Sequence, residues 1–311
     1  MSSLLRDVIE LLCRPLQVVI ARLLDTILAR GGWRRFPWLI VAYRLTARYC
    51  NRLSFKEVKR LLMIDAEHSI RSLSVTATGV LQCFCADRLF MIPGGDVSAH
   101  SLAQSHQNWQ ALRAGGWPTL AGYEFECHHA DTVYSMELLA SPASSQEAVT
   151  ILSQIADSRK GALQAFEWQP LIDRLARFFC MDAFEVVQRC EQRVAFGLLH
   201  GDFHVGNIMR SKQGDLVLID LDRLCSRAPQ FIDHLNFKVY QREQELARSW
   251  LSVIATGDID LEGYSREQWL AYILFRSAAE VSSYTPGIRY RKRFKSAVSA
   301  IDTMFDTTVA E

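Results

Sequence analysis

Residues 198–209 read LLHGDFHVGNIM, and residues 216–223 read LVLIDLDR. The first stretch is an apolar run followed by a polar loop, in which Asp202 and Asn207 lie five positions apart. A polar turn containing a glycine leads to the second stretch, an apolar run that ends at Asp220. Two apolar runs separated by such a turn indicate a β-hairpin. We therefore expect the hairpin to bring Asp202, Asn207 and Asp220 to one end.

These three side chains have the chemistry that phosphoryl transfer requires. The oxygens of Asn207 and Asp220 suit Mg²⁺, a hard cation that keeps several waters and bridges substrate phosphates. Asp202 then remains to accept the proton of an attacking hydroxyl, in a reaction that depends mainly on positioning and charge neutralisation. Each residue alone is more simply explained as a turn residue that bonds local backbone. The full string H-G-D-x-x-x-x-N, with I-D-x-D thirteen residues beyond the Asn, is much more specific.

This string resembles the catalytic loop of the aminoglycoside phosphotransferase and choline kinase group, which are protein-kinase-like kinases of small molecules. The resemblance rests on His200-Gly201-Asp202, His204, Gly206 and Asn207, with Asp220 after the hairpin. It implies ATP and Mg²⁺ as cofactors, Asp202 as catalytic base, and Asn207 and Asp220 as metal ligands. The general layout agrees with this family from about Ser69 to the C-terminus.

The resemblance also implies roles for residues outside the loop. The backbone of Leu138, Leu139 and Ala140 would contact the adenine ring, because this segment lies where the family has its hinge. Asp233 matches a family residue that steadies the catalytic loop, although an acid in the first turn of a helix explains it equally well. Among the supporting residues, His200 and His204 belong to the loop, and Asp222 either tunes the metal site or pairs with Arg223.

A second likeness concerns the acceptor. Residues 219–223, IDLDR, are similar to the I-D-F-D-R string of bacterial kinases that phosphorylate Kdo or heptose in the lipopolysaccharide core. This likeness implies a sugar of a lipid-linked glycan at the inner membrane face as the acceptor. A soluble aminoglycoside-type or metabolite kinase is the alternative.

One part of the chain departs from the family pattern. Kinases of this kind have a Lys on the third strand and a Glu on the following helix, but Met91 occupies the lysine position here. The predicted helix Ser98 to Ala114 contains neither Lys nor Glu. Arg88 is a candidate to reach the phosphates instead, although a guanidinium does not simply replace an ammonium group, and an exposed arginine at a strand start is the other explanation. A pseudokinase that senses nucleotide or acts as a scaffold is therefore the alternative from another functional class.

Periodicity predicts an α+β chain with a two-lobed, protein-kinase-like fold. We expect an N-terminal helical extension (residues 1–66), a small antiparallel-sheet lobe (67–140) and a larger helical lobe (141–311) whose catalytic loop spans 198–223. Strands are expected at 69–76, 79–85, 88–93, 123–129 and 132–139, with one helix at 98–114. Further helices are expected at 146–158, 170–179, 183–196, 231–255 and 266–283. Ser145 is expected near the N-cap of the first of these helices, and Ser265 with Gln268 forms a capping box for the last.

The charge is unevenly distributed along the chain. The 311 residues carry a net charge of +1, but residues 1–60 hold 12 basic and 4 acidic side chains, so the remainder is acidic by seven charges. The near-neutral total argues against a nucleic-acid-binding protein. The leader is either a helix packed on the main domain or an amphipathic helix in a membrane interface. The basic run 289–295 is either a solvated face or, with residues 1–60, a peripheral contact with an anionic membrane.

Cysteine usage indicates the compartment. The eight cysteines contain no C-x-x-C pair and mostly lie in apolar runs, which is typical of reduced core thiols in a cytoplasmic protein. No signal peptide is evident, since Arg6, Asp7 and Glu10 interrupt the first apolar stretch. No apolar run approaches the roughly 18 residues that a spanning helix needs.

Overall fold

The computed structural model describes residues 64, 68, 71–76, 80–93, 96–115, 117, 120–128, 133–156, 163, 165–179, 195–283 and 288–308. The basic segment 1–60, with its expected helix, lies outside these residues, as does most of the helix expected at 183–196. The chain forms two compact units. The first contains Met1–Gln110, Gly122–Ala140 and Ser211–Asp215, and the second contains Ala111–Ala121, Ser141–Arg210 and Leu216–Glu311.

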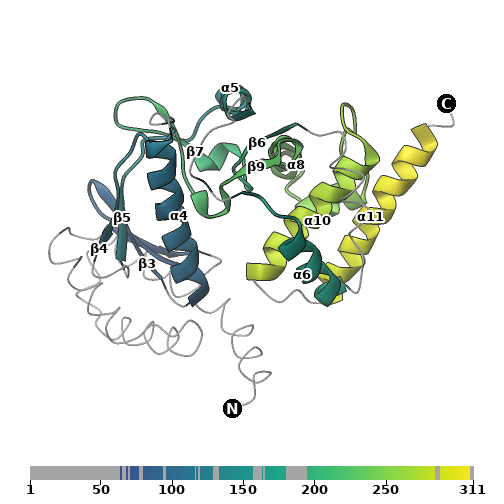
Figure 1. Cartoon of the computed structure of the whole chain (residues 1–311), viewed down its shortest axis with the longest axis horizontal. Helices are drawn as coiled ribbons and strands as arrows, with labels where there is room; N and C mark the ends of the chain where they lie inside the picture. The colour runs from purple at the N-terminus through teal and green to yellow at the C-terminus, as the bar shows by residue number, and fades with distance from the viewer. Residues whose placement is uncertain are drawn as a thin grey trace, which may run out of the picture. The chain divides into compact units, whose positions relative to one another are not determined.

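The first unit is built on an antiparallel sheet. Its strands are β1 (Ser72–Val75), β2 (Val80–Phe84), β3 (Arg88–Pro93), β4 (Phe125–His128) and β5 (Val133–Glu137), in the order β1-β2-β3-β5-β4. Figure 1 labels β3, β4 and β5 of this sheet. Every neighbouring pair is antiparallel. The expected meander of three strands, with two further strands after the helix, is confirmed.

Helix α4 (Asp96–Ala114) follows β3 and packs through one apolar stripe. Leu102, Trp109 and Leu112 are buried at helical spacing. The rings of His106 and Trp109 contact Phe125 of β4, with centroids 5.2 and 6.0 Å apart. Aromatic burial of this kind contributes roughly 1.5–3 kcal/mol for each ring, so this cluster fixes the helix against the sheet.

The second unit is mainly helical, with two small two-stranded sheets. Its helices are α5 (Ser145–Ala156), α6 (Gln169–Phe179), α8 (Phe231–Leu246), α9 (Trp250–Ala255), α10 (Arg266–Ser283) and α11 (Ile288–Thr308). Strand β6 (Phe196–Leu199) pairs with β9 (Cys225–Pro229), and β7 (Ile208–Arg210) pairs with β8 (Leu216–Leu218). Two 3-10 turns, η2 (Val205–Asn207) and η3 (Leu221–Arg223), complete it. An α+β chain with a small antiparallel sheet followed by a helical portion is the fold class that the sequence predicts.

Helix α10 is the centre of this helical core. All seven residues from Trp269 to Phe275 are buried, as expected of a helix surrounded by others. Helix α10 packs against α6, α8 and α11, and Figure 1 shows α10 and α11 side by side. Helix α11 was not predicted, because its basic first turns obscure a buried stripe of Phe294, Ala297 and Ile301.

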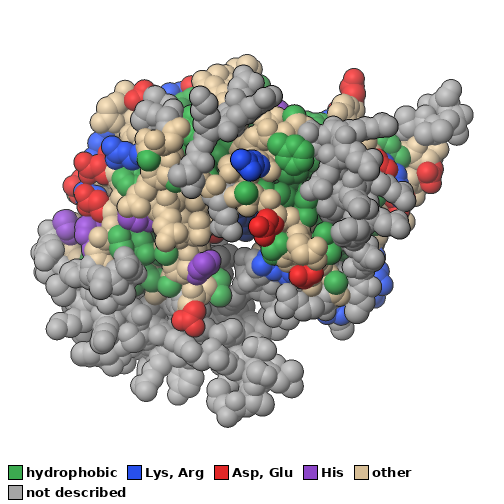
Figure 2. Space-filling model, in the orientation of Figure 1, with side chains coloured by type: hydrophobic (Ala, Val, Ile, Leu, Met, Phe, Trp, Pro, Cys, Tyr) green, Lys and Arg blue, Asp and Glu red, His purple; other side chains and the backbone are tan. Residues whose placement is uncertain are grey.

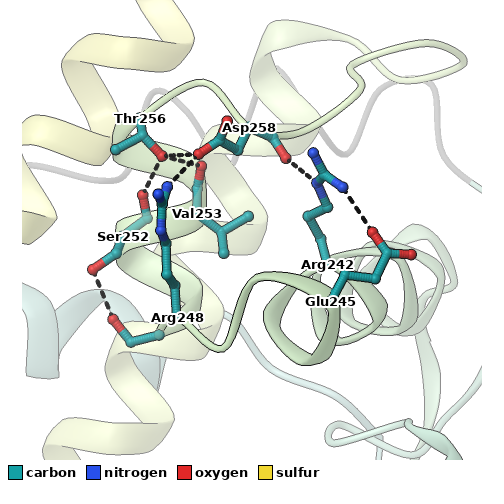
Figure 3. A network of polar contacts seen from close by, with 8 residues as sticks. Arg242, Glu245, Arg248, Ser252, Val253, Thr256 and Asp258 are labelled. Carbon is teal, nitrogen blue, oxygen red and sulfur yellow. Dashed lines mark hydrogen bonds and ion pairs between the residues drawn. The ribbon is translucent and has the colours of Figure 1, made fainter.

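The single helix expected over 231–255 is wrong, since the chain breaks between α8 and α9. Ala247 adopts the left-handed conformation with φ 49°, and the N–H of Trp250 is accepted by the side chain of Glu243 at 2.7 Å. A polar network then ties the turn after α9 back to α8 (Figure 3). In it, Asp258 accepts Arg248 through its carboxylate at 2.6 Å and Arg242 through its carbonyl at 2.9 Å.

The helix caps were partly predicted. Ser265 and Gln268 form the expected capping box, with reciprocal bonds of 2.8 and 3.3 Å. The expectation that Ser145 lies near the N-cap of α5 is also confirmed, because the neighbouring residue is the cap. Ser144 makes the capping box with Glu147, whose carboxylate accepts both its N–H and its hydroxyl.

Surface and chemical features are consistent with this fold. On the face seen in Figure 2, charged side chains of both signs are interspersed with polar and apolar ones. The described cysteines, Cys83, Cys85, Cys127 and Cys225, are free thiols. Across the described residues, no helix has the length and apolar character needed to span a membrane.

Candidate active site

The backbone of the expected catalytic loop is set by His200, which follows β6 and is fully buried. His200 donates its Nε2–H to the carbonyl oxygen of Ile219 at 2.9 Å and accepts the N–H of Asp202 at Nδ1 at 3.3 Å. These two partners assign the proton of the ring to Nε2. His200 therefore connects the start of the loop to the end of β8, just before Asp220.

Asp233, in the first turn of α8, fixes the same segment from the other side. Its carboxylate accepts the N–H of His200 at 2.6 Å and the N–H of Gly201 at 2.9 Å. Burial raises the pKa of Asp233 to about 6, against the lowering effect of His200 and of the two N–H bonds. This contact is of the kind that the resemblance implies for Asp233.

Gly201 needs to be a glycine. Its φ is +82°, and a Cβ atom there would lie 2.7 Å from the Cβ of Arg223. A side chain would therefore be strained by the backbone and would also collide with η3. The close approach brings Arg223 beside the next residue, Asp202.

Asp202 lies in a strongly positive environment. Its burial favours the neutral acid, but the charge of Arg223, followed by His204, Arg276 and His200, outweighs burial and lowers the pKa of Asp202. Its Oδ1 receives the side-chain N–H of Asn236 at 3.4 Å. No described residue donates a hydrogen bond to its Oδ2. Asp202 is thus an ionised carboxylate with one oxygen available as an acceptor.

Asn207 is buried and oriented by the loop. Its side-chain N–H bonds the carbonyl oxygen of Asp202 at 2.9 Å, so its Oδ1 is the end left for another partner. Its own carbonyl accepts the N–H of Ile219 at 3.0 Å. Because Asp220 follows Ile219 directly, this bond brings Asp220 next to Asn207.

Asp220 is exposed and adopts the left-handed conformation, with φ 58°. Asn and Asp are the residues that best tolerate this backbone. Loss of solvation by the surrounding protein, followed by the charges of Asp222 and Asp202, raises the pKa of Asp220 to about 7. Asp202 and Asp222 therefore each repel the carboxylate of Asp220 at this end of the hairpin.

This donor set fits a magnesium ion that keeps most of its own water. No group of three His, Cys, Asp or Glu side chains in the described ranges is arranged to hold a metal by itself. Asn207 and Asp220 nevertheless supply two oxygens, and Mg²⁺ is usually bound by one or two carboxylates together with substrate phosphates. A cation would also relieve the repulsion among the carboxylates.

His204 packs beside the loop. Its Nδ1 accepts the N–H of Gly206 at 3.1 Å, and its ring stacks on Tyr240 of α8 at 4.3 Å and 13°. Burial lowers the pKa of His204, although Asp202 opposes this effect. These contacts shape the turn that carries Asn207.

The remaining predicted residues lie in the first unit. Arg88, at the start of β3, bonds Glu124 at 3.1 Å and Glu126 at 3.0 Å. Met91 is buried in the sheet. Leu138 donates its N–H to Asp87 at 3.0 Å, whereas no described residue accepts the N–H of Leu139 or Ala140.

Sequence reasoning missed a polar group behind Asp202, formed by Asn236 and Glu243 of α8 with Tyr272 and Arg276 of α10. Tyr272 donates to Asn236 at 3.2 Å, and Arg276 bonds Tyr272 at 2.9 Å and Glu243 at 3.0 Å. The only sequence signal was a polar residue inside each of two apolar helical stretches.

Comparisons with known proteins gave one family match. Residues 134–231 match the sequence profile of the phosphotransferase enzyme family, a range that includes Asp202, Asn207 and Asp220. A search of curated protein sequences gave no significant match.

Two solved structures of one kinase share the fold at low sequence identity, and a third structure is a weaker match. Choline kinase LicA from Streptococcus pneumoniae is 13% identical over 80% of this chain and 100% of that chain, with a TM-score of 0.51. The structure of LicA in complex with AMP is 15% identical over 80% and 99%, with a TM-score of 0.50. A thermostable mutant of aminoglycoside phosphotransferase APH(4)-Ia is 12% identical over 81% and 99%, with a TM-score of 0.47. Residues 134–231 therefore resemble the phosphotransferase enzyme family, and the chain shares the fold of the choline kinase LicA.

Proposed function

We propose that the protein transfers the γ-phosphoryl group of ATP to a hydroxyl group of a small molecule. The observation that carries this proposal is the environment of Asp202, an ionised carboxylate whose Oδ2 receives no hydrogen bond from a described residue. Asn207 bonds its backbone, and Asp220 interacts with it electrostatically. A base beside two cation-binding oxygens is the arrangement that phosphoryl transfer needs.

In this mechanism Asp202 orients the acceptor hydroxyl and takes its proton at Oδ2. The hydroxyl oxygen forms a bond to the γ-phosphorus while the bond between that phosphorus and the β–γ bridging oxygen breaks, so ADP leaves. Asn207 and Asp220 would hold Mg²⁺, which neutralises charge on the phosphates when it is bound. Asp233 and His200 keep the loop backbone in place throughout.

The nucleotide contacts are proposed from the family resemblance. The N–H groups of Leu139 and Ala140 are candidates to meet the adenine ring, because no described residue accepts them. Leu138 can contribute its carbonyl, since its N–H is bonded to Asp87. The complex of LicA with AMP supports nucleotide binding by this fold.

The missing lysine keeps a pseudokinase as the competing proposal. Met91 stands at the expected lysine position, and Arg88 already bonds Glu124 and Glu126. For Arg88 to bind phosphates it must exchange those partners. Retention of Asp202, Asn207 and Asp220 favours an active enzyme, because a nucleotide sensor needs no base.

The deciding experiment measures ADP release from ATP by the full chain, with and without Mg²⁺ and with pooled hydroxyl acceptors. We expect Mg²⁺-dependent turnover that falls at least about a hundredfold in Asp202→Ala, since base and positioning are both lost. The matched control is Asp215→Ala, in the exposed β7–β8 turn. Binding of ATP without turnover in the wild type would support the pseudokinase, and equal turnover in Asp202→Ala would reject the base.

For the acceptor we propose a sugar hydroxyl of a lipid-linked glycan, such as the lipopolysaccharide core. The IDLDR run at 219–223 and the basic segment 1–60 support this choice. Helix α11 adds four exposed cations, Arg291, Lys292, Arg293 and Lys295, near its first turns. Cations at the N-terminal end of a helix are unfavourable because that end of the helix dipole is positive. An anionic headgroup bound there would offset this cost.

Sedimentation with liposomes tests the membrane part. The full chain is compared with a full-length variant carrying Arg291→Ala, Lys292→Ala and Lys295→Ala, on vesicles with and without anionic lipid. We expect binding only to anionic vesicles, weakened by salt and by about 1 kcal/mol for each cation removed. No binding to either vesicle would favour a soluble metabolite kinase.

A further inference from the structure

The carboxylate of Asp202 is the end of a hydrogen-bonded chain that runs through two helices. Asn236 of α8 donates to Asp202 Oδ1, Tyr272 of α10 donates to Asn236 Oδ1, and Arg276 donates to Tyr272. The N–O and O–O distances along the chain are 3.4, 3.2 and 2.9 Å. Asn236 and Tyr272 are buried, so this chain is protected from water.

The direction of each bond is fixed by the number of protons available. A guanidinium group only donates, so Tyr272 accepts from Arg276 and has a single proton left to give. Asn236 must therefore present its oxygen to Tyr272 and its NH₂ group to the other side. On that side, the NH₂ group of Asn236 also donates to the carbonyl oxygen of Phe203 at 3.1 Å. A carbonyl oxygen can only accept a hydrogen bond. Two independent partners thus assign one orientation of the amide.

The far end of the chain is anchored. Glu243 accepts Arg276 at 3.0 Å and the N–H of Trp250 at 2.7 Å, and the Arg276 guanidinium lies 4.9 Å from the centre of the Trp250 ring. Burial raises the pKa of Tyr272 to about 12, so its hydroxyl keeps its proton in neutral solution. The break between α8 and α9 is what brings the N–H of Trp250 to Glu243.

We propose that Asn236 is a positioning residue for the catalytic carboxylate, and that Tyr272 and Arg276 act through it by keeping its NH₂ group turned toward Asp202. The proposal rests on the function proposed for Asp202. Asp233 and Asn236 lie three positions apart on one face of α8. One helical turn therefore holds both the backbone of the loop and the carboxylate that it carries, while leaving Oδ2 for the acceptor hydroxyl.

The test is a double-mutant cycle with the full chain, using Asn236→Ala, Tyr272→Phe and the double variant. Mg²⁺-dependent ATP turnover is measured with the same pooled hydroxyl acceptors. We expect kcat to fall about tenfold in Asn236→Ala and about threefold in Tyr272→Phe, with KM for ATP within about twofold, because only carboxylate positioning changes. Since Tyr272 acts through Asn236, the double variant should match Asn236→Ala alone.

Two controls separate positioning from stability. Ser277→Ala lies on α10, five residues beyond Tyr272, and removes a buried hydroxyl with no described partner, so kcat should not change. Arg266 is also on α10 but is not part of the hydrogen-bonded series from Arg276 to Asp202. Arg266→Ala breaks its ion pair with Asp302 and should lower the melting temperature without lowering kcat. If Asn236→Ala does not fold, the Tyr272→Phe measurement decides.

The outcomes distinguish this inference from the proposed function. Wild-type protein without turnover, or Asp202→Ala with full turnover, rejects the function and with it this inference. An active wild type with an inactive Asp202→Ala, but unchanged kcat in Asn236→Ala or Tyr272→Phe, rejects the inference alone. Losses that add in the double variant also reject it, because they indicate independent packing effects.

Discussion

The carboxylate of Asp233 accepts the backbone N–H of His200 at 2.6 Å, across 33 positions of sequence. The same carboxylate accepts the N–H of Gly201 at 2.9 Å. One residue of α8 therefore supplies the hydrogen-bond acceptor for two buried N–H groups that water cannot reach. The loop that carries Asp202 is therefore held by the helical core as well as by its own strand. Substitution of Asp233 should affect folding and catalysis together.

Asp233→Ala leaves both N–H groups without an acceptor in the buried loop. Each unsatisfied buried donor costs about 1–3 kcal/mol, so the free energy of unfolding should fall by about 2–6 kcal/mol. Urea denaturation at pH 7.5 measures the change. Asp258→Ala, in the exposed network of Figure 3, is the control and should cost less than about 1 kcal/mol. Equal losses in the two variants would contradict the role of Asp233.

The raised pKa of Asp233 predicts how stability depends on pH. Its pKa is about 6 in the folded protein and near the ordinary aspartate value of 3.8 in the unfolded chain. Between these values the folded state binds the proton more tightly, so the contribution of Asp233 to stability declines as pH rises from about 4 to 6 and is constant above.

Asp233→Asn should remove this decline. The slope of unfolding free energy against pH should be more negative in wild type than in the variant between pH 4 and 6, by up to about 1.4 kcal/mol per pH unit. Denaturant titrations at several pH values provide the slope for each protein. The titration of all other groups contributes equally to both slopes and cancels when one slope is subtracted from the other. Parallel curves would contradict the assignment.

Two glycines offer a matched test of the loop geometry. Gly201 and Gly214 have similar positive φ values, +82° and +90°, but a Cβ atom meets Arg223 at 2.7 Å only at Gly201. Gly214→Ala should cost about 1–2 kcal/mol from the backbone alone. Gly201→Ala should cost more and should also lower kcat, because Asp202 is displaced. Thermal unfolding and ATP turnover report both effects, and equal costs would reject the close contact.

Local patterns in the sequence were sufficient to predict the sheet and the catalytic string. Strands 80–84 and 88–93 are short, mainly apolar runs separated by a short turn, and the pairing of such neighbours is determined locally. Likewise Asp202, Asn207 and Asp220 are joined by one hairpin, so their proximity follows from the turn. The structure places β7 and β8 in this hairpin as expected.

Contacts between distant segments were not predictable from one sequence. The partners of Asn236 lie 34 positions before it and 36 after it, and nothing in periodicity indicates which buried polar residue meets which. The pairing of Arg88 with Glu124 and Glu126 needs the register of β3, β5 and β4. The break at Ala247 depends on a left-handed alanine, a conformation that local propensity disfavours.

Asp220→Asn should separate metal binding from folding. Asn tolerates the left-handed backbone at this position as well as Asp does, so the substitution mainly removes a charge that Asp222 and Asp202 repel. The pKa of Asp220, about 7, is above that of the unfolded chain, so its charged form destabilises the folded protein fully at pH 8. Without Mg²⁺, the variant should therefore unfold at the same temperature as wild type or higher.

With saturating Mg²⁺ and ATP, wild type should gain stability as RT ln(1 + [L]/Kd), whereas the variant should lose the part of this gain that requires Mg²⁺. Thermal unfolding of both proteins, with ATP alone and with Mg²⁺ and ATP, measures the two effects. The same Mg²⁺-dependent gain in Asp220→Asn would contradict the role of Asp220 as a metal ligand.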